Sequence, residues 1–384
     1  MGEAFLPKRV METASAPVGY YPNLLDWVQA SGLNREKHFR ELYNSYSFEY
    51  KDASSLGKTP PPQFQGGRIT APTANVAVIP SGRVWGMNGA VLSQDNMLLS
   101  DVSIEFYVDT LIKGEKHPAL HDWKPFPLVN TSETVAALTF GISQNYFHWL
   151  FDVLPRLHLI QLSGLKPSKY VLNRTVKMAF QDETLNMVGI PAESRLETHA
   201  EFHLQADNLI VPSLIGTSSF SYYPKWVCDY LRSVMLPHAD EEVRNGPERI
   251  YVSRARAETR RIKNEQEVME RLSAKGFVCV ELESMTVRQQ IRLFRSAKWV
   301  VAPHGAGLTN LVFCEPGTKV LELFTPNYMP RHYWLISNHC GLDYWYLTGT
   351  GDGREGDWNL VENMFINVEE LSRTLSKMGV DTRH

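Results

Sequence analysis

The sequence predicts an α/β protein with two domains built on parallel sheets. Three observations support this fold class. The chain has 384 residues, more than a single domain usually holds. From residue 135 onward, short apolar runs alternate with stretches of helical periodicity. A polar segment at 237–247, with two prolines and an Asn-Gly pair, is typical of an exposed linker.

The first domain is expected at residues 1–236. Its opening 130 residues are irregular and predict little beyond a short strand at 75–79. After them, strands at 135–140, 169–172 and 208–211 alternate with helices at 144–163, 177–188 and 223–236. Such alternation indicates β-α units with parallel strands.

The second domain is expected at 248–366, where the alternation is clearer. Strands are predicted at 249–253, 277–281, 298–302 and 319–324, separated by helices at 264–275, 286–296 and 307–313. A final helix is predicted within 367–384, with Asn367 as its N-cap and Glu370 at the capping-box position.

Composition excludes several classes of protein. Hydrophobic residues make up 43% and charged residues 21%, which disordered and fibrous chains do not show. The formal net charge of −3 removes nucleic acid as a default partner. The four cysteines lack metal-site spacing, and neither a secretory leader nor a long apolar run is found. We therefore expect a cytoplasmic protein without a transmembrane segment.

A glycine turn is the most distinctive local feature. The strand at 298–302 runs into Pro-His-Gly-Ala-Gly-Leu-Thr-Asn at 303–310. Unpaired N–H groups at the start of the following helix favour a phosphate, and glycine lets the ligand approach closely. His304 would add a side-chain donor. The alternative is a plain tight turn with a satisfied histidine.

A cluster of cations follows the strand at 249–253. Arg254, Arg256, Arg260, Arg261 and Lys263 fall within ten residues. In a parallel sheet, this cluster and the glycine turn share one edge, where together they could neutralise a diphosphate. Arg254 is the strongest candidate because it leaves the strand first. The alternative is a solvated basic loop.

Glu322 interrupts an apolar run that should be buried on both faces. A carboxylate there must be hydrogen-bonded. It could accept from the hydroxyls of a nucleoside ribose. A structural salt bridge to Arg331 or Lys319 is the alternative.

Three polar residues stand out in the otherwise apolar segment 145–159. His148, Asp152 and Arg156 are spaced at i, i+4 and i+8, so a helix would place them on one stripe, although Pro155 should kink or end it. An imidazole beside a carboxylate is a plausible general base for a hydroxyl, with Asp152 taking the proton or orienting His148. The alternative is a buried network that only fixes helix packing.

Some motifs are missing. The sequence has no Asp-x-Asp triplet to hold a divalent metal against a diphosphate, so the arginines would have to supply the positive charge. It also lacks G-x-x-x-x-G-K-[ST] and G-x-G-x-x-G, which weakens kinase, ATPase and nicotinamide interpretations.

These combined motifs, from Asn145 to Leu157 and from Tyr251 to Glu322, closely resemble glycosyltransferase family 61. The resemblance covers roughly residues 140–325 in order. It implies the GT-B architecture, with two Rossmann-like domains facing across a cleft, and inversion at the anomeric carbon without an obligatory metal or other cofactor. It also implies a sugar nucleotide, typically a UDP-sugar, bound by the second domain, and a glycan or glycolipid acceptor bound mainly by the first.

The site residues implied by the resemblance fall into three groups. Asp152 and His148 are the catalytic candidates, and Asn145 and Arg156 are expected on the acceptor side. The expected donor-binding residues are Arg254, Arg260, Arg261, His304, Gly305, Ala306, Gly307, Thr309, Asn310 and Glu322.

Without a signal anchor, the chain looks more like bacterial members assigned to capsular or other surface polysaccharide synthesis, working in the cytosol near the inner membrane face. Two rival functions remain: a non-catalytic nucleotide- or glycan-binding subunit, and an isomerase of the sugar-nucleotide 2-epimerase kind. The sequence leaves the donor sugar, the linkage and the oligomeric state open.

Overall fold

The computed structural model describes residues 10–11, 14–57, 59–107, 110–216, 222–239, 246–353 and 359–380. Contacts divide the chain into two units, one of residues 1–46 and 70–227 and the other of residues 47–69 and 228–384. The predicted linker at 237–247 lies after this division, and its residues 240–245 are outside the described part. Residues 47–69 join the second unit, although the sequence analysis places all of 1–236 in the first domain.

The first unit contains a mixed sheet with the strand order β13-β12-β11-β14-β6-β7-β8-β2, to which β1 and β3 are added on β11 and β6. The strands are β1 (Val10–Met11), β2 (Gly19–Tyr21), β3 (Phe39–Tyr43), β6 (Ala74–Trp85), β7 (Ala90–Leu92), β8 (Met97–Leu99), β11 (Leu128–Ala137), β12 (Lys169–Leu172), β13 (Arg195–Glu197) and β14 (His203–Pro212). A separate ribbon pairs β9 (Glu105–Tyr107) with β10 (Thr110–Ile112).

The parallel strands predicted for this unit are present in β13, β12, β11 and β14. The expectation of an all-parallel sheet is wrong, however, because β6 pairs antiparallel with β14 and β7 pairs antiparallel with β6. These additional strands come from the first 130 residues. A short connection joins β6 to β7, so a hairpin rather than a crossover extends the sheet.

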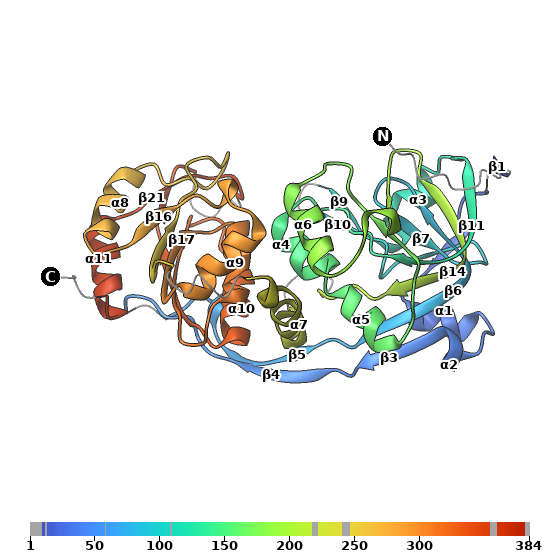
Figure 1. The fold of residues 1–384 in the computed structure, drawn as a ribbon, viewed down its shortest axis with the longest axis horizontal. Helices are drawn as coiled ribbons and strands as arrows, with labels where there is room; N and C mark the ends of the chain where they lie inside the picture. Colours follow the sequence, from blue (N-terminus) through green and yellow to red (C-terminus); the bar gives the residue numbers. More distant parts are fainter. Residues whose placement is uncertain are drawn as a thin grey trace. The chain divides into compact units, whose positions relative to one another are not determined.

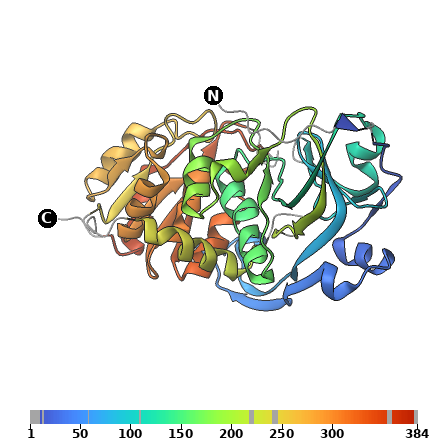
Figure 2. The same cartoon turned by 45° about the vertical axis from the view of Figure 1, so that its right-hand side comes forward.

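Helices pack against the first sheet and share a buried core with it. The helices are α1 (Leu24–Ala30), α2 (Arg35–His38), α3 (Pro118–His121), α4 (Tyr146–His148), α5 (Arg156–Ser163) and α6 (Ala179–Met187). Helix α5 packs on β3, β6 and β14 (Figures 1 and 2). Leu24, Trp27 and Val28 of α1 join a core with strand residues that include Ile79 and Leu209. Helix α7 (Lys225–Met235) begins in this unit and continues into the second.

A buried arginine joins the ends of two parallel strands. Arg156, the first residue of α5, is 0% exposed. Its guanidinium donates to the carbonyl oxygens of Ala137 at 2.9 Å, Thr139 at 3.0 Å and Pro212 at 3.0 and 3.3 Å. Ala137 and Pro212 are the last residues of β11 and β14. Burial lowers the pKa of Arg156 to about 9, which leaves it charged at neutral pH.

The second unit contains a fully parallel sheet, as the alternation predicts, with the order β16-β15-β17-β18-β19. Its strands are β15 (Arg249–Val252), β16 (Val278–Val280), β17 (Trp299–Pro303), β18 (Lys319–Phe324) and β19 (Asp343–Thr348). The strand order reverses between β15 and β17. In open α/β sheets, ligands bind at the carboxyl ends of the strands beside such a reversal.

Helices cover both faces of this sheet. They are α8 (Glu265–Ser273), α9 (Val287–Ser296), α10 (His332–Cys340), α11 (Val368–Lys377) and the 3-10 helix η7 (Ala306–Phe313). Figure 1 shows α8 and α11 together on one face and α9 and α10 on the other. The predicted cap of α11 is confirmed, because Asn367 Oδ1 accepts from the backbone N–H groups of Glu369 at 3.0 Å and Glu370 at 3.1 Å.

Residues 47–69 lie along the outer edge of β19. Ser54 bridges to Trp345 as a parallel strand would. Phe64 is fully buried, with its ring centroid 5.5 Å from that of Phe324 and 5.3 Å from that of Tyr346. This segment thus covers a sheet edge that would otherwise expose unpaired backbone groups. Its two ends lie in β4 (Tyr46–Tyr50) and β5 (Gly67–Ala71), which pair with each other. Elsewhere in this unit, β20 (Thr350–Gly351) pairs with β21 (Met364–Phe365).

A glutamate lies in the middle of the buried strand β18. Glu322 is 0% exposed, and its two oxygens lie 2.5 Å from His304 Nδ1 and 2.6 Å from the Tyr344 hydroxyl. Burial raises the pKa of Glu322 well above its usual range and lowers the pKa of His304 well below its own. Both directions favour a neutral pair that shares the carboxyl proton. Its described partners are not the Arg331 and Lys319 considered from the sequence.

Replacing Arg156 by methionine leaves three buried carbonyl groups without donors. We expect the free energy of unfolding to fall by about 2–5 kcal/mol. Urea unfolding followed by circular dichroism measures this loss. Lys177→Met is the control, since Lys177 forms an exposed ion pair with Glu197 and its replacement should cost about 0.5 kcal/mol or less. An equally small effect of Arg156→Met would contradict the structural role of Arg156.

Replacing Glu322 by glutamine should stabilise the protein more at pH 8 than at pH 5. A raised carboxyl pKa means that the folded state holds its proton more tightly than the unfolded state. The contribution of Glu322 to wild-type stability therefore falls as the pH rises from the unfolded pKa toward the folded one, by at most about 1.4 kcal/mol per pH unit. Glutamine does not titrate, and its amide can still pair with His304 and Tyr344.

Urea unfolding of both proteins at the two pH values tests this prediction. The exposed Glu369→Gln, which removes one side of an ion pair with Arg271, is the control and should show no such trend. A difference between Glu322→Gln and wild type that does not change with pH would mean that Glu322 is ionised in the folded protein.

Candidate active site

Asn145, the first candidate residue, caps a short helical turn. Asn145 precedes α4, and its Oδ1 accepts from the backbone N–H groups of Phe147 at 2.9 Å and His148 at 3.4 Å. These bonds satisfy N–H groups that a helix start leaves unpaired. Asn145 is exposed, so its predicted acceptor contact stays a prediction beside this capping role.

A π-turn follows the capped turn. Residues Trp149–Val153 form this wider turn, and Pro155 precedes α5. The additional residue per turn rotates Arg156 away from the stripe that His148 and Asp152 share. The structure brings His148 and Asp152 together, as the spacing predicts, whereas the Arg156 guanidinium is hydrogen-bonded to backbone carbonyl groups. Arg156 is buried against the strand ends, and its predicted acceptor contact stays a prediction beside this structural role.

His148, Asp152 and Tyr223 form a hydrogen-bonded chain. His148 Nδ1 lies 2.8 Å from Asp152 Oδ2, and the Tyr223 hydroxyl donates to both Asp152 oxygens at 3.0 and 3.1 Å. Asp152 is fully buried, whereas 15% of the His148 side chain is exposed. Burial and the Asp152 carboxylate raise the pKa of Tyr223 well above its usual range, so Tyr223 remains a donor.

The second candidate site lies at the carboxyl ends of β15 and β17, beside the reversal of strand order. Arg254 follows β15, and Gly305 follows β17. Their sequence-predicted convergence is confirmed, because a Cβ added at Gly305 would lie 2.8 Å from Arg254 Cζ and collide with the guanidinium. Arg254 Nη2 donates to the carbonyl of Thr259 at 3.0 Å, while its buried Nε has no hydrogen-bond partner.

Arg260 lies at the same edge. Its Nε donates to the carbonyl of His304 at 3.3 Å, its Nη1 donates to the carbonyl of Leu360, and its guanidinium carbon lies 5.3 Å from the centre of the Tyr328 ring. Burial, and secondarily the charge of Arg260, lower the pKa of Arg254 to about 10. Among the described residues, neither arginine forms an ion pair with a carboxylate. The two adjacent positive charges therefore favour an anion.

Arg260 adopts an uncommon backbone conformation. Its φ of 56° lies in the left-handed region, which glycine favours and which costs other residues free energy. The chain nevertheless has an arginine there, and its side chain lies over the glycine turn.

The remaining cations of the predicted cluster do not join these two arginines. Arg256 forms an exposed ion pair with Glu281 at 2.7 Å, and Lys263 forms one with Asp352 at 2.7 Å. Arg261 is exposed. The interpretation as a solvated basic loop therefore describes part of the cluster, and donor binding by Arg261 stays a prediction.

Some residues of the glycine turn are partly exposed, and others are buried. Ala306 and Gly307 are partly exposed. Thr309 and Asn310 are 0% exposed and donate to the carbonyls of Ala306 at 2.6 Å and Gly307 at 3.0 Å, because the 3-10 helix directs them inward. Thr309 and Asn310 are thus bonded within the turn, and their predicted donor contacts stay a prediction.

Two further residues predicted to bind the donor, Glu322 and His304, are buried behind the turn. Glu322 has both oxygens hydrogen-bonded and no exposed surface, and its predicted ribose contact stays a prediction beside this structural role. His304 is 4% exposed and packs behind the turn, where its ring stacks on Phe324 at a centroid distance of 5.4 Å. Glu322 and His304 thus support the turn from within.

Two tyrosines were missed by the sequence analysis. Tyr223 pairs with Asp152, and Tyr344 pairs with Glu322. Neither tyrosine lies at a fixed spacing from its partner, so no local pattern identifies it. Only the general rule that buried carboxylates need donors indicates that such partners exist.

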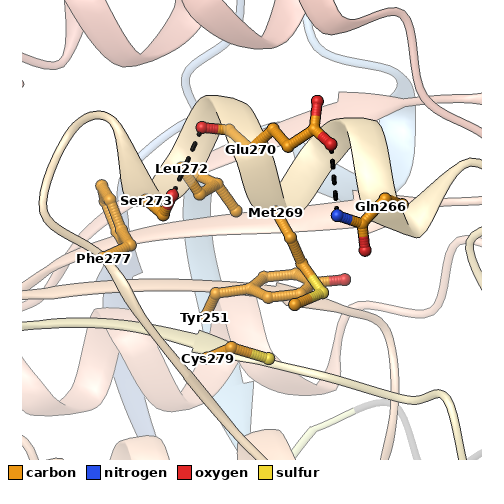
Figure 3. A pocket seen from close by; sticks show the side chains of 8 residues that line it. All are labelled: Tyr251, Gln266, Met269, Glu270, Leu272, Ser273, Phe277 and Cys279. Carbon is orange, nitrogen blue, oxygen red and sulfur yellow. Dashed lines mark hydrogen bonds between the residues drawn. The ribbon is translucent and has the colours of Figure 1, made fainter.

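A small pocket of about 150 Å³ lies elsewhere in the second unit, between α8 and the edge strand β16 (Figure 3). Its lining includes Tyr251, Met269, Leu272, Phe277 and Cys279, and none of the predicted site residues. Glu270 at its rim accepts from Gln266 at 3.1 Å. We assign this pocket no role in the candidate site.

Within the described part of the chain, no group of three or more His, Cys, Asp or Glu side chains is arranged to hold a metal ion. The four cysteines form no disulfide. No described helix combines the length and apolar character needed to cross a membrane.

Comparison with known proteins places both candidate sites in one family segment. Residues 146–321 match the family described as Glycosyltransferase 61. This segment contains His148 and Asp152 as well as Arg254, Arg260 and the glycine turn. It covers somewhat less than half of the chain.

Two plant relatives agree with this match. A stretch of 92 residues is 38% identical to the beta-1,2-xylosyltransferase RCN11 of Oryza sativa subsp. japonica, covering 22% of this chain and 17% of that protein. A stretch of 63 residues is 33% identical to a beta-1,2-xylosyltransferase of Arabidopsis thaliana, covering 16% of this chain and 12% of that protein. Each match therefore spans less than a fifth of the relative's length. Residues 146–321 thus carry a segment of the glycosyltransferase 61 type, and these similarities support a glycosyltransferase.

Proposed function

We propose that the chain is an inverting glycosyltransferase that moves a sugar from a UDP-sugar to a hydroxyl of a glycan acceptor. The observation that carries this proposal is the pair Arg254 and Arg260, two guanidinium groups at the carboxyl ends of β15 and β17 without a carboxylate partner among the described residues. A diphosphate is the leaving group that such a pair matches best.

The donor side stabilises charge that develops during transfer. As the bond between the anomeric carbon and the diphosphate breaks, negative charge builds up on the leaving oxygen. Arg254, Arg260 and the backbone N–H groups at Ala306 and Gly307 would stabilise it more strongly in the transition state than in the bound donor. In this proposal, the arginines supply the charge that a metal ion supplies in other transferases.

The acceptor side activates a hydroxyl. The burial of Asp152 argues against direct proton transfer to its carboxylate, and favours His148 as the base and Asp152 as a positioning residue. With His148 Nδ1 donating to Asp152, the imidazole lone pair lies on Nε2, which would take the proton. Asp152 would then stabilise the imidazolium, while the Tyr223 hydroxyl fixes the carboxylate.

The proposed step is a single displacement. The acceptor oxygen forms a bond to the anomeric carbon on the face opposite the diphosphate, its proton passes to His148, and the electron pair of the broken bond leaves on the diphosphate. Attack from the opposite face inverts the anomeric configuration. The relatives' printed names favour a pentosyl group as a first donor to test. The surface polysaccharide setting, the cytoplasmic location and the GT-B arrangement remain predictions from the resemblance.

Replacing Asp152 by asparagine should lower the transfer rate by about 10²–10⁴-fold, because the amide no longer stabilises a charged imidazole. Affinity for UDP should stay within about twofold of wild type. Transfer is measured with UDP-xylose and a glycan acceptor panel, and UDP binding is measured by calorimetry. Asp182→Asn, which alters an exposed carboxylate paired with Arg174, is the control. An unchanged transfer rate in Asp152→Asn would remove Asp152 from the mechanism.

Replacing Gly305 by alanine should displace the Arg254 guanidinium without unfolding the chain, because the colliding atoms belong to the end of a flexible side chain. We expect UDP affinity to fall about tenfold or more in Gly305→Ala and in Arg254→Ala. Calorimetry with UDP measures both. The exposed Arg256→Ala is the matched control and should bind UDP as wild type does. Equal UDP affinities in all four proteins would contradict the proposed donor site.

A further inference from the structure

A cavity of about 400 Å³ lies in the first unit, apart from the His148–Asp152 pair. It opens where β14 ends, since Ser213 and Leu214 line it together with Asn75 at the start of β6. Its volume falls in the range of small-molecule sites. The described residues that line it all belong to the first unit.

Two residues that line this cavity, Asp101 and Asn75, each have a buried side-chain oxygen without a hydrogen-bond partner. Asp101 Oδ2 accepts from the backbone N–H of Leu24 at 3.1 Å, at the start of α1, but Asp101 Oδ1 is buried and unpaired. The backbone of Asn75 is paired, because its N–H donates to Ser213 Oγ at 3.1 Å and its carbonyl accepts from Ser213 N–H at 2.9 Å. Asn75 Oδ1, however, is also buried and unpaired.

Unpaired buried acceptors are costly, so a native site that keeps two of them in one cavity indicates donors supplied from outside the chain. Burial raises the pKa of Asp101 to about 7, against the lowering effect of Lys113. A carboxyl group with such a pKa can pair with a hydroxyl in either protonation state.

The remaining lining is partly apolar and partly polar. Phe39 is buried, and Leu25 and Leu214 are partly buried. Glu41 and Lys113 are exposed at the rim. Lys113 disfavours a metal cation beside Asp101, and the apolar walls disfavour a phosphate. Hydroxyl groups beside apolar C–H surface match this lining, and that combination is typical of a sugar.

We propose that this cavity binds one sugar residue of a carbohydrate, with sugar hydroxyls donating to Asp101 and Asn75 and the C–H face of the ring packing on Phe39 and Leu214. Pro212, the last residue of β14, precedes Ser213 and accepts a hydrogen bond from Arg156. Arg156 follows Asp152 by four residues in the chain. The cavity therefore lies at the end of β14 that Arg156 contacts. The bound sugar is a remote residue of the acceptor, an assignment that rests on the proposed transferase function.

Saturation-transfer NMR with the full chain tests binding directly. The probes are the methyl glycosides of xylose, glucose, galactose and mannose. We expect saturation transfer to at least one of them. Asp101→Asn should weaken binding about tenfold, because the amide oxygen can keep the bond to Leu24 N–H while its NH₂ group replaces an acceptor in the cavity. Leu214→Trp, which fills the cavity, should abolish binding.

Asp122→Asn is the matched control, since Asp122 is exposed and does not line the cavity. It should bind the glycosides as wild type does. Absence of saturation transfer to every glycoside in the wild-type protein overturns the proposal. So does binding that neither Asp101→Asn nor Leu214→Trp changes.

Kinetics separate this proposal from the proposed function. For an active transferase, Asp101→Asn should raise KM for an oligosaccharide acceptor about tenfold while kcat and KM for the donor stay near wild type. Active transfer with an unchanged acceptor KM in both cavity variants overturns the acceptor subsite and leaves the transferase in place. Glycoside binding that the variants weaken, in a protein that transfers no sugar, supports the cavity and contradicts the transferase.

Discussion

The geometry of the first candidate site depends on how one buried positive charge is satisfied. The Arg156 guanidinium has no solvent contact and is held by carbonyl groups at the ends of β11 and β14. Because these strands are neighbours in the sheet, Arg156 fixes the start of α5 against a rigid edge. The π-turn immediately before it carries Asp152, and the turn before that carries His148. The position of the candidate base thus follows in part from a buried residue that is bonded to the backbone.

Other polar groups of the protein are either paired with one another or left without a partner of opposite charge. Glu322 and His304 satisfy each other with the help of Tyr344, and they support the glycine turn from behind. Arg254 and Arg260 retain positive charge without a carboxylate among the described residues. A buried polar group without a hydrogen-bond or ion-pair partner costs free energy. Such groups therefore mark places where a ligand can bind favourably. Asp101 and Asn75 also have side-chain atoms without partners, but these atoms are acceptors rather than positively charged donors.

The sequence predicts the second unit better than the first, and the reason is physical. Alternating strands and helices determine a parallel sheet, and the carboxyl ends of its strands share one edge, so the approach of Arg254 to Gly305 follows from topology. Side-chain direction does not follow from topology, so the burial of Thr309 and Asn310 could not be predicted. The segment around His148 is apolar on nearly all sides, so no periodicity reveals the π-turn that moves Arg156. The N-terminal strands are hard to predict because most are short and the longest, β6, contains Pro80 and Gly82.

The contribution of residues 47–69 to the second unit has a consequence for anyone who dissects this protein. The polypeptide passes between the two units near residues 46, 69 and 227, so neither unit corresponds to one uninterrupted stretch of the gene. A fragment beginning at residue 228 would lack Phe64 and the strand-like bridge at Ser54, leaving the β19 edge and an aromatic layer open to solvent. Isolated halves would thus tend to aggregate for reasons unrelated to activity, and functional studies require the covalently continuous chain.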